Sequence, residues 1–171
     1  MTENNMKIDY SKVEEMRTRQ SHFAVDINAP RQKVWTALTN EIGRWWPRDL
    51  VTGPAVKFSF DLRVGGRLWE DHGKGAGVEW GSIKALIPET RIVLTTDVFP
   101  DMGGPARSVM EYTLEDTETG TRVRWSENRF GCIDDSVMMG QWLPPWSYGL
   151  EGRLKPYVEG TEMKGGPAVE E

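Results

Sequence analysis

The chain has 171 residues, of which 38% are hydrophobic and 27% charged, so it is long enough for one domain with a core of its own. Its formal net charge of −5 lacks the clustered Lys/Arg excess that nucleic-acid partners demand, and no run of about eighteen apolar residues could cross a membrane. We therefore expect a soluble, cytoplasmic protein with neither nucleic acid nor membrane as partner. The lone Cys132 allows no disulfide within the chain, as is usual in a reducing compartment.

Both ends of the chain are polar. Residues 1–20 lack the basic start and apolar run of a secretion signal, and we treat them as an N-terminal extension. Residues 161–171 carry too few apolar groups to offset the entropy lost on ordering, so a flexible tail is expected there. The folded domain should accordingly span residues 21–160.

The domain begins with a strand and short helices. The segment 22–30 alternates apolar with polar side chains, the period of a half-buried strand, and Pro30 ends it. In 30–47 the apolar residues recur four apart, which predicts one or two short helices. Trp45 and Trp46 follow these helices, and we expect them to plug one end of the space between a sheet and its covering helix, as core residues.

A hairpin and further strands come next. The strand at 56–63 leads to glycines at 65 and 66, a turn that hairpins prefer, and pairing across it should place Trp69 on the same face as Phe60 and Leu62. The remaining strand-like runs, separated by turn sequences, predict an antiparallel meander. These runs are "GVEWGSIKALI", "RIVLTTDVF", "SVMEYTLED" and "TRVRWSENRF".

The last segment, 134–160, changes period, because its apolar residues recur every four positions as in an amphipathic helix. Pro144 and Pro145 should break this helix, and Pro156 should kink it. The predicted fold class is therefore α+β: a seven-stranded, curved antiparallel sheet wrapped around a long C-terminal helix, with two short helices after the first strand.

This order of elements resembles the START-like helix-grip (SRPBCC) superfamily, and more closely the bacterial homologues of the activator of the heat-shock-protein ATPase. The resemblance spans about residues 21 to 159, and it rests on "FAVDINAPRQKVWTALTN", "GRWWP", "FDLRVGGRLWED", "GSIKALIPETRIVLTTD" and "GTRVRWSE". It implies an internal cavity that holds a hydrophobic small molecule in many relatives. It does not imply one reaction, because the superfamily includes carriers, cyclases and cochaperone domains.

The segment "RVRWSENRF" carries polar residues on a face that should be apolar. If strand alternation continues past Trp125, Glu127 and Arg129 also point inward. Buried polar groups are costly unless they are paired, so the two side chains either pair with each other or hold the polar end of a ligand. Tyr112 is a further candidate donor.

Catalytic and metal-binding patterns are scarce in the sequence. His22 and His72 lie on different segments, opposite the apolar residues of their strands, so exposed or rim positions are expected for both. The spacing of Cys and His residues matches no zinc motif, and we expect no metal and no cofactor. Glu70 and Glu79 are weaker candidates, because the register between their strands is not fixed by the sequence.

The leading functional hypothesis is binding of a small hydrophobic or aromatic molecule in a cavity between sheet and C-terminal helix, without catalysis. Flexible methionines at 110, 138 and 139 would help such a pocket to adapt its shape. The alternatives are a cyclase-like or hydrolase-like enzyme that uses a cavity carboxylate, and a cochaperone-type interaction domain; a homodimer is also open. The candidate ligand-binding residues are Trp45, Trp46, Phe58, Phe60, Trp69, Trp80, Met110, Tyr112, Trp125, Glu127, Arg129, Trp142, Trp146 and Leu150.

Overall fold

The computed structural model of the chain describes residues 15–54, 57–100, 103–133 and 148–169. These residues form the expected seven-stranded antiparallel sheet, with strand order β1-β7-β6-β5-β4-β3-β2. The strands are β1 (Arg17–Ile27), β2 (Lys57–Phe60), β3 (Arg67–Gly73), β4 (Ala76–Ile87), β5 (Arg91–Val98), β6 (Ala106–Asp116) and β7 (Thr121–Gly131). The helical elements are α1 (Arg31–Thr39), the short 3₁₀ turns η1 (Ile42–Arg44) and η2 (Arg48–Leu50), the π-helical η4 (Leu150–Leu154) and α4 (Lys155–Glu159).

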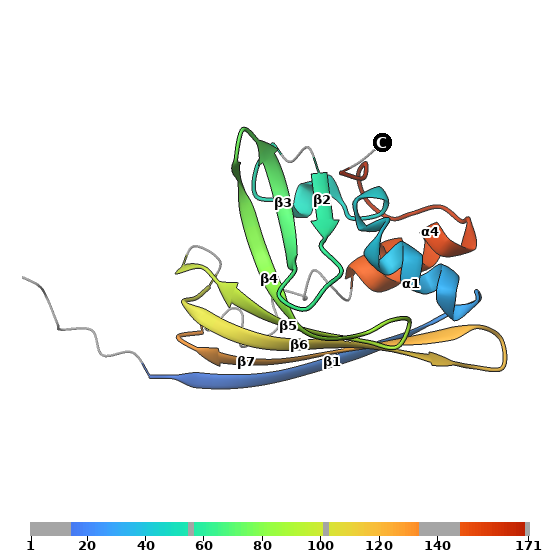
Figure 1. Ribbon diagram of the computed structural model, residues 1–171, viewed down its shortest axis with the longest axis horizontal. Helices are drawn as coiled ribbons and strands as arrows, with labels where there is room; N and C mark the ends of the chain where they lie inside the picture. Colours follow the sequence, from blue (N-terminus) through green and yellow to red (C-terminus); the bar gives the residue numbers. More distant parts are fainter. Residues whose placement is uncertain (1–14, 55–56, 101–102, 134–147, 170–171) are drawn as a thin grey trace, which may run out of the picture.

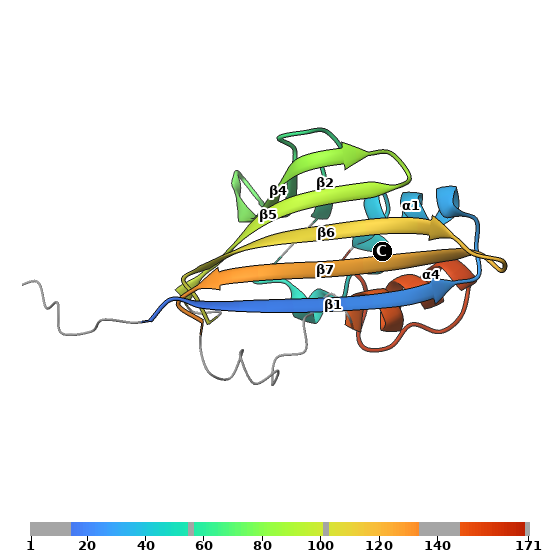
Figure 2. The ribbon, with the colours of Figure 1, turned by 90° about the horizontal axis from the view of Figure 1, so that it is seen from below.

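The sheet is strongly curved. In Figure 1, β1 and β5–β7 form the lower layer, whereas β2–β4 rise steeply from it, and α1 and α4 lie in the hollow of the curve. Figure 2 shows the molecule from below, so that the face of the lower layer turned away from the helices is in front. The helices α1 and α4 lie behind this layer, at the right of the view. The inner face of the sheet thus carries the helices, and the outer face is open to solvent.

Strand β1 begins earlier than the sequence predicted. Its pairing with β7 runs from Arg17, opposite Gly131, to Ile27, opposite Thr121. Residues 17–20 therefore belong to the sheet rather than to the N-terminal extension. The alternation was masked there because the first inward-facing positions carry polar side chains such as Arg19.

The hairpin of β2 and β3 differs from the prediction in its register. Ser59 pairs with Trp69, and Phe60 pairs with Leu68, so Trp69 lies on the face opposite Phe60. The two glycines do not close a two-residue turn. Instead, the N–H of Gly65 donates to the carbonyl of Ile83 at 2.8 Å, and Gly66 accepts from the same residue at 2.8 Å, so the loop 61–66 extends the pairing toward β4.

The paired tryptophans are core residues, as expected. Trp45 is fully buried and Trp46 is 4% exposed; their rings meet edge to face with centroids 5.7 Å apart. The Trp46 ring also stacks on Phe58 at 5.0 Å, which joins β2 to the turns after α1. A Cβ atom at Gly149 would lie 3.3 Å from both indole rings, so the absence of a side chain there lets the C-terminal helical segment sit directly on the tryptophan pair.

The long C-terminal helix is not confirmed. Within the described residues, η4 and α4 form a short, irregular helical unit, and the predicted break at Pro144 and Pro145 lies outside these residues. The distortion at Pro156 takes the form of the π-helical turn before it. Because proline has no N–H to offer the carbonyl of Gly152, that carbonyl accepts instead from the N–H of Lys164 at 3.0 Å.

Residues 161–169 are packed against the domain, so the prediction of a flexible tail is wrong for them. Val169 is 2% exposed, and its N–H donates to the carbonyl of Trp46 at 3.1 Å. The tail also accepts hydrogen bonds from the buried guanidinium of Arg153, through the carbonyls of Lys164 at 2.8 Å and Gly166 at 2.7 Å. These hydrogen bonds, together with the burial of Val169 and the packing of Met163 against the core, offset the entropy lost on ordering the tail.

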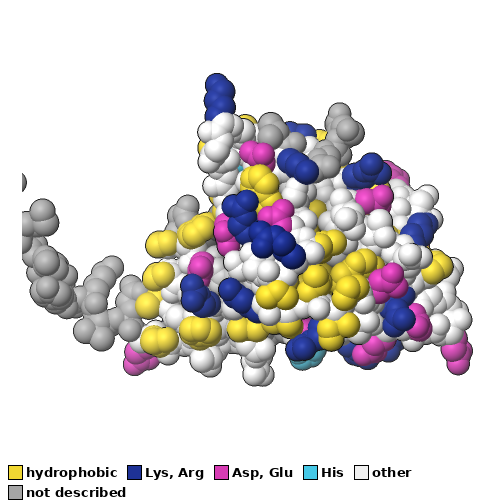
Figure 3. Space-filling model, viewed as in Figure 1, with side chains coloured by type: hydrophobic (Ala, Val, Ile, Leu, Met, Phe, Trp, Pro, Cys, Tyr) yellow, Lys and Arg dark blue, Asp and Glu magenta, His cyan; other side chains and the backbone are white. Residues whose placement is uncertain are grey.

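Charge is spread in pairs over the surface. Figure 3 shows basic and acidic side chains intermixed on one face of the molecule, with hydrophobic side chains in a band below them. Three of the cross-strand pairs, Arg122 with Asp26, Arg124 with Glu115 and Arg107 with Asp97, are solvent-exposed and contribute little stability each. No helix in the described ranges has the length and apolar character needed to cross a membrane.

Candidate functional site

The inner face of β6 and β7 carries an aromatic patch that ends in a charge. In the β6–β7 register Tyr112 lies opposite Trp125, and Met110 lies opposite Glu127. Tyr112 and Trp125 are at most 1% exposed, Met110 is 5% exposed and Glu127 is 4% exposed. The predicted continuation of strand alternation past Trp125 is therefore confirmed, and it brings a carboxylate onto an otherwise apolar face.

Glu127 is held by two neighbours through one of its oxygens. The hydroxyl of Ser108 donates to Oε1 at 2.7 Å, and Arg129 donates to the same oxygen through Nη2 at 2.9 Å and Nε at 3.3 Å. The side chain of Arg129 is 17% exposed, so this is a largely buried ion pair. Of the two alternatives that the sequence left open, the structure shows the pairing of Glu127 with Arg129.

A second hydroxyl extends this polar row onto β5. Thr96 lies opposite Ser108 in the β5–β6 register and is 6% exposed. Its Oγ1 is buried and makes no hydrogen bond with any described residue. Thr96 and Ser108 were not predicted from the sequence. Both lie at inward-facing positions of their strands, two residues from Leu94 and Met110 respectively, so strand alternation is the signal that could have identified them.

Tyr112 stays a neutral phenol at physiological pH. Burial raises its pKa well above the ordinary value of 10.0, and the negative charge of Glu127 raises it further. Both effects oppose the formation of an anion at this place. The patch is thus an apolar surface in which extra negative charge is unfavourable.

A second buried carboxylate, Glu70, is fully enclosed by its own domain. Its Oε1 accepts from the indole of Trp80 at 2.6 Å; its Oε2 accepts from the N–H and hydroxyl of Thr52 at 3.0 and 2.9 Å and lies 3.1 Å from Nε2 of His72. Glu70 thereby ties the loop after η2 to β3 and β4. Its partners all belong to the fold, which is the arrangement of a structural carboxylate.

The facing of the remaining candidates is also settled. His72 shares the inward parity of Leu68 and Glu70, so its predicted position opposite the apolar residues is wrong, whereas His22 is exposed. Glu79 is exposed. The prediction for His72 was wrong because it followed from the predicted β2–β3 register, which placed Trp69 rather than Leu68 on the inner face.

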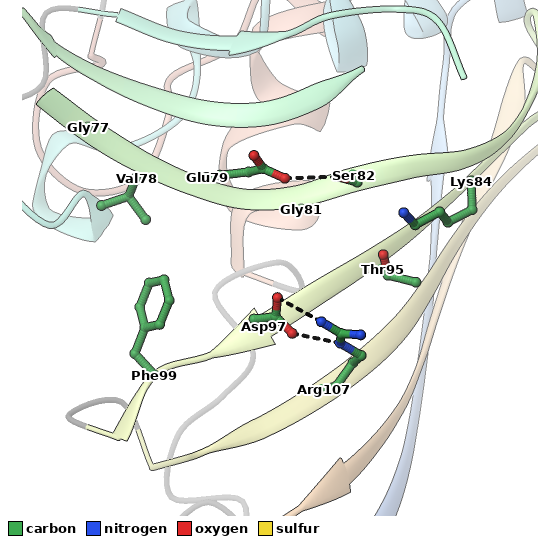
Figure 4. Close-up of a pocket in the computed structure, with 10 residues that line it drawn as sticks. All are labelled: Gly77, Val78, Glu79, Gly81, Ser82, Lys84, Thr95, Asp97, Phe99 and Arg107. Atoms are coloured by element: carbon green, nitrogen blue, oxygen red, sulfur yellow. Dashed lines mark hydrogen bonds and ion pairs between the residues drawn. The ribbon is translucent and has the colours of Figure 1, made fainter. Parts of the chain in front are cut away.

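The outer face has a separate groove where β4 and β5 part. The two strands pair only from Ser82, opposite Thr95, onward, and Figure 4 shows β4 diverging from β5 before that point. The resulting hollow has a volume of about 520 Å³. Its charged groups are mostly satisfied locally, since Arg107 binds Asp97 through two hydrogen bonds of 2.7 and 3.2 Å and Ser82 donates to Glu79 at 2.8 Å. It is lined by Gly77, Val78, Glu79, Gly81, Ser82, Lys84, Thr95, Asp97, Phe99 and Arg107.

This fold has counterparts among known proteins. The family model described as "Activator of Hsp90 ATPase homolog 1-like protein" matches residues 28–144, more than half of the chain. The chain belongs to this family. No curated protein matches it.

Solved structures share the fold of this chain at low sequence identity. An uncharacterized protein from Rhizobium leguminosarum is 17% identical with a TM-score of 0.66, and the alignment covers 87% of this chain and 99% of that one. The Aha1 dimer from Colwellia psychrerythraea is 21% identical with a TM-score of 0.58, covering 82% and 96%. DynU16, from the dynemicin biosynthetic locus, is 17% identical with a TM-score of 0.57, covering 82% of this chain and 47% of that one.

Apart from the Glu127–Arg129 pair, the predicted ligand-binding residues divide into three groups. Seven belong to one buried core cluster, namely Trp45, Trp46, Phe58, Met110, Tyr112, Trp125 and Leu150, and Phe60 and Trp80 are partly buried against it. Trp69 lies on the opposite face of β3. Trp142 and Trp146 fall outside the described residues, as do Met138 and Met139. Among the described residues no three His, Cys, Asp or Glu side chains are placed to hold a metal ion.

Proposed function

We propose that this chain binds a small, mostly apolar molecule on the inner face of β5–β7, and that Glu127 and Arg129 hold the polar end of that molecule. The observation that carries the proposal is the Glu127–Arg129 ion pair, 4% and 17% exposed, at the end of an aromatic face. A buried ion pair seldom adds stability over apolar side chains of the same volume, because both charges must leave water. A binding role gives these two residues a purpose that stability does not.

The apolar part of the site suits a flat ligand. Burying about 200 Å² of apolar ligand surface against Tyr112 and Trp125 contributes roughly 5 kcal/mol before the cost of immobilisation. Micromolar affinity needs about 8 kcal/mol, so the polar end has to supply part of the binding energy. Met110 lies between the two ends, and its unbranched side chain adapts to ligands of different shape. Membership of a superfamily whose relatives often hold hydrophobic molecules supports the same role.

Two substitutions on adjacent positions of β6 test this proposal. Met110→Trp places a large ring into the inner patch, whereas Val109→Trp places the same ring on the outer face, where Val109 is 40% exposed. The full-length protein is titrated with Nile red, a neutral dye whose emission rises in apolar surroundings. We expect the wild type and the Val109 variant to bind the dye alike, and the Met110 variant to bind it at least tenfold more weakly. Equal binding by all three proteins would refute the inner-face site.

We also infer that the chain forms a homodimer. Strand β1 ends the sheet, and along Arg17–Ile27 its outer edge pairs with no other described strand. Such edges readily pair with a second chain, and the related Colwellia protein is a dimer. Light scattering behind a sizing column checks this: the mass of two chains supports the dimer, and the mass of one chain over a range of concentrations contradicts it.

A further inference from the structure

The hydrogen bonds of Glu127 are distributed unevenly between its two oxygens. All three donors, Ser108 Oγ and both Arg129 nitrogens, reach Oε1. No described residue donates to Oε2. An ionised carboxylate has about four acceptor positions. Within the described residues, Oε2 of Glu127 therefore keeps acceptor capacity for a further donor.

Thr96 presents a second unused group beside the first. Its side chain lies across from Ser108 on the neighbouring strand, and Ser108 is itself bonded to Glu127. Side chains directly opposite each other in an antiparallel pair have Cβ atoms about 5 Å apart. The Oγ1 of Thr96 is buried without a partner, and a hydroxyl can donate as well as accept. The patch thus offers two polar groups at neighbouring positions: Oε2 of Glu127, which can accept a hydrogen bond, and the hydroxyl of Thr96, which can donate or accept one.

The charge of the row restricts what can bind there. Glu127 and Arg129 neutralise each other, so an added anion or cation would leave a net charge in a buried site, which is unfavourable. The raised pKa of Tyr112, caused by burial and by Glu127, shows how the same surroundings oppose an anion. Arg19, the next cation along the row, lies opposite Arg129 on β1 and is itself engaged.

We infer that the polar end of the ligand is a neutral hydroxyl group, as in a phenol or an alcohol, which donates to Oε2 of Glu127 and accepts from Thr96. This inference rests on the proposed function, because it presupposes an apolar ligand on the inner face. It adds the chemical class: a hydroxyl compound, in preference to a carboxylate or a plain hydrocarbon.

Three probes of one shape test the inference. The full-length protein is titrated calorimetrically at neutral pH with 4-ethylphenol, 4-ethyltoluene and 4-ethylbenzoate, which present a hydroxyl, a methyl and a carboxylate at the same place. We expect 4-ethylphenol to bind about tenfold more tightly than 4-ethyltoluene, because one hydrogen bond to a charged group contributes about that much affinity. We expect 4-ethylbenzoate to bind most weakly of the three.

A pair of substitutions on β5 provides the matched control. Thr96→Val removes the inner hydroxyl at almost constant shape, and Thr95→Val does the same at a residue that lines the outer groove. The Thr96 variant should bind the phenol about fivefold more weakly and the hydrocarbon unchanged, while the Thr95 variant should match the wild type.

The outcomes separate the inference from the proposed function. If the benzoate binds as tightly as the phenol, or if Thr96→Val leaves the phenol affinity unchanged, the hydroxyl class is wrong, although an apolar site remains. If none of the three probes binds and Met110→Trp leaves Nile red binding unchanged, the inner-face site itself is refuted and the inference with it.

Discussion

The side chain of Arg153, 1% exposed in the C-terminal helical unit, donates through Nε to the carbonyl oxygen of Trp45 at 2.8 Å. The same guanidinium binds the carbonyls of Lys164 and Gly166. One buried side chain thereby joins three segments: the turn after α1, the last helix and the tail.

Replacing this guanidinium should destabilise the whole domain. Arg153→Met keeps much of the apolar stem but leaves three carbonyls without their donor, one of them the buried carbonyl of Trp45, so the free energy of unfolding should fall by about 3 kcal/mol. Urea unfolding followed by tryptophan fluorescence measures the loss. Arg63→Met, at an exposed position of the 61–66 loop, should change it by less than about 0.5 kcal/mol. Equal effects of the two substitutions would show that Arg153 does not join the segments.

The contact between Gly149 and the tryptophan pair should tolerate no large side chain. A Cβ there already lies 3.3 Å from both rings, so Gly149→Leu must push the helix away from Trp45 and Trp46, at a cost of about 1 to 3 kcal/mol. Thermal unfolding reports the loss, and near-ultraviolet circular dichroism reports the altered packing of the rings. Gly166→Ala, where an added Cβ meets nothing within 4 Å, is the control and should leave both signals in place.

The two glutamates on β3 and β4 should respond differently to the same change. Glu70→Gln leaves one carboxyl-derived oxygen where two now accept from the N–H and hydroxyl of Thr52 and from Trp80, so we expect the free energy of unfolding measured in urea to fall by about 2 kcal/mol. Glu79→Gln changes an exposed residue that contacts Ser82 and should be close to neutral. A neutral Glu70 variant would contradict the structural role assigned to that carboxylate.

Tyr112 should make the protein sensitive to alkali. Its folded pKa lies well above the value of about 10 that it has in the unfolded chain, because of burial and then Glu127. The folded state therefore prefers the protonated phenol, and its contribution to stability is complete below pH 10 and is lost as the pH rises above that value.

An absorbance titration of tyrosinate formation checks this prediction. One tyrosine should resist ionisation until the protein unfolds, and in Tyr112→Phe the denaturant midpoint should fall less between neutral pH and pH above 10 than in the wild type. Ionisation of every tyrosine near 10 in the folded protein would disprove it.

The sequence was informative where a pattern is local. Strand alternation alone located Glu127 and Arg129 on the inner face, because the pleat of one strand decides which side each residue faces. The pairing of β2 with β3 depends on the loop between them, and its glycines bond to Ile83 of β4 rather than closing a tight turn. Because of that non-local contact, Trp69 lies on the face opposite to the predicted one, and Glu70 and His72 lie on the inner face.

The tail shows a different reason for failure. Composition predicted that residues after 160 would gain too little from burial to be ordered, and only Val169 among the described tail residues is fully buried, with Met163 partly buried against the core. What orders them is a set of main-chain hydrogen bonds. The carbonyls of Lys164 and Gly166 accept from Arg153, and the N–H of Lys164 donates to the carbonyl of Gly152, which Pro156 leaves open. No single-sequence pattern marks acceptors of this kind, because every residue carries a carbonyl.

The contact between residues 45–48 and 167–169 also bears on how the protein is made. Arg48 donates to the carbonyl of Val169, 121 positions later in the chain, and the carbonyl of Trp46 accepts from the N–H of Val169. During synthesis residues 45–48 emerge long before residues 167–169. The tryptophan end of the core can therefore close only after Val169 has left the ribosome, by which time every strand of the sheet has been made.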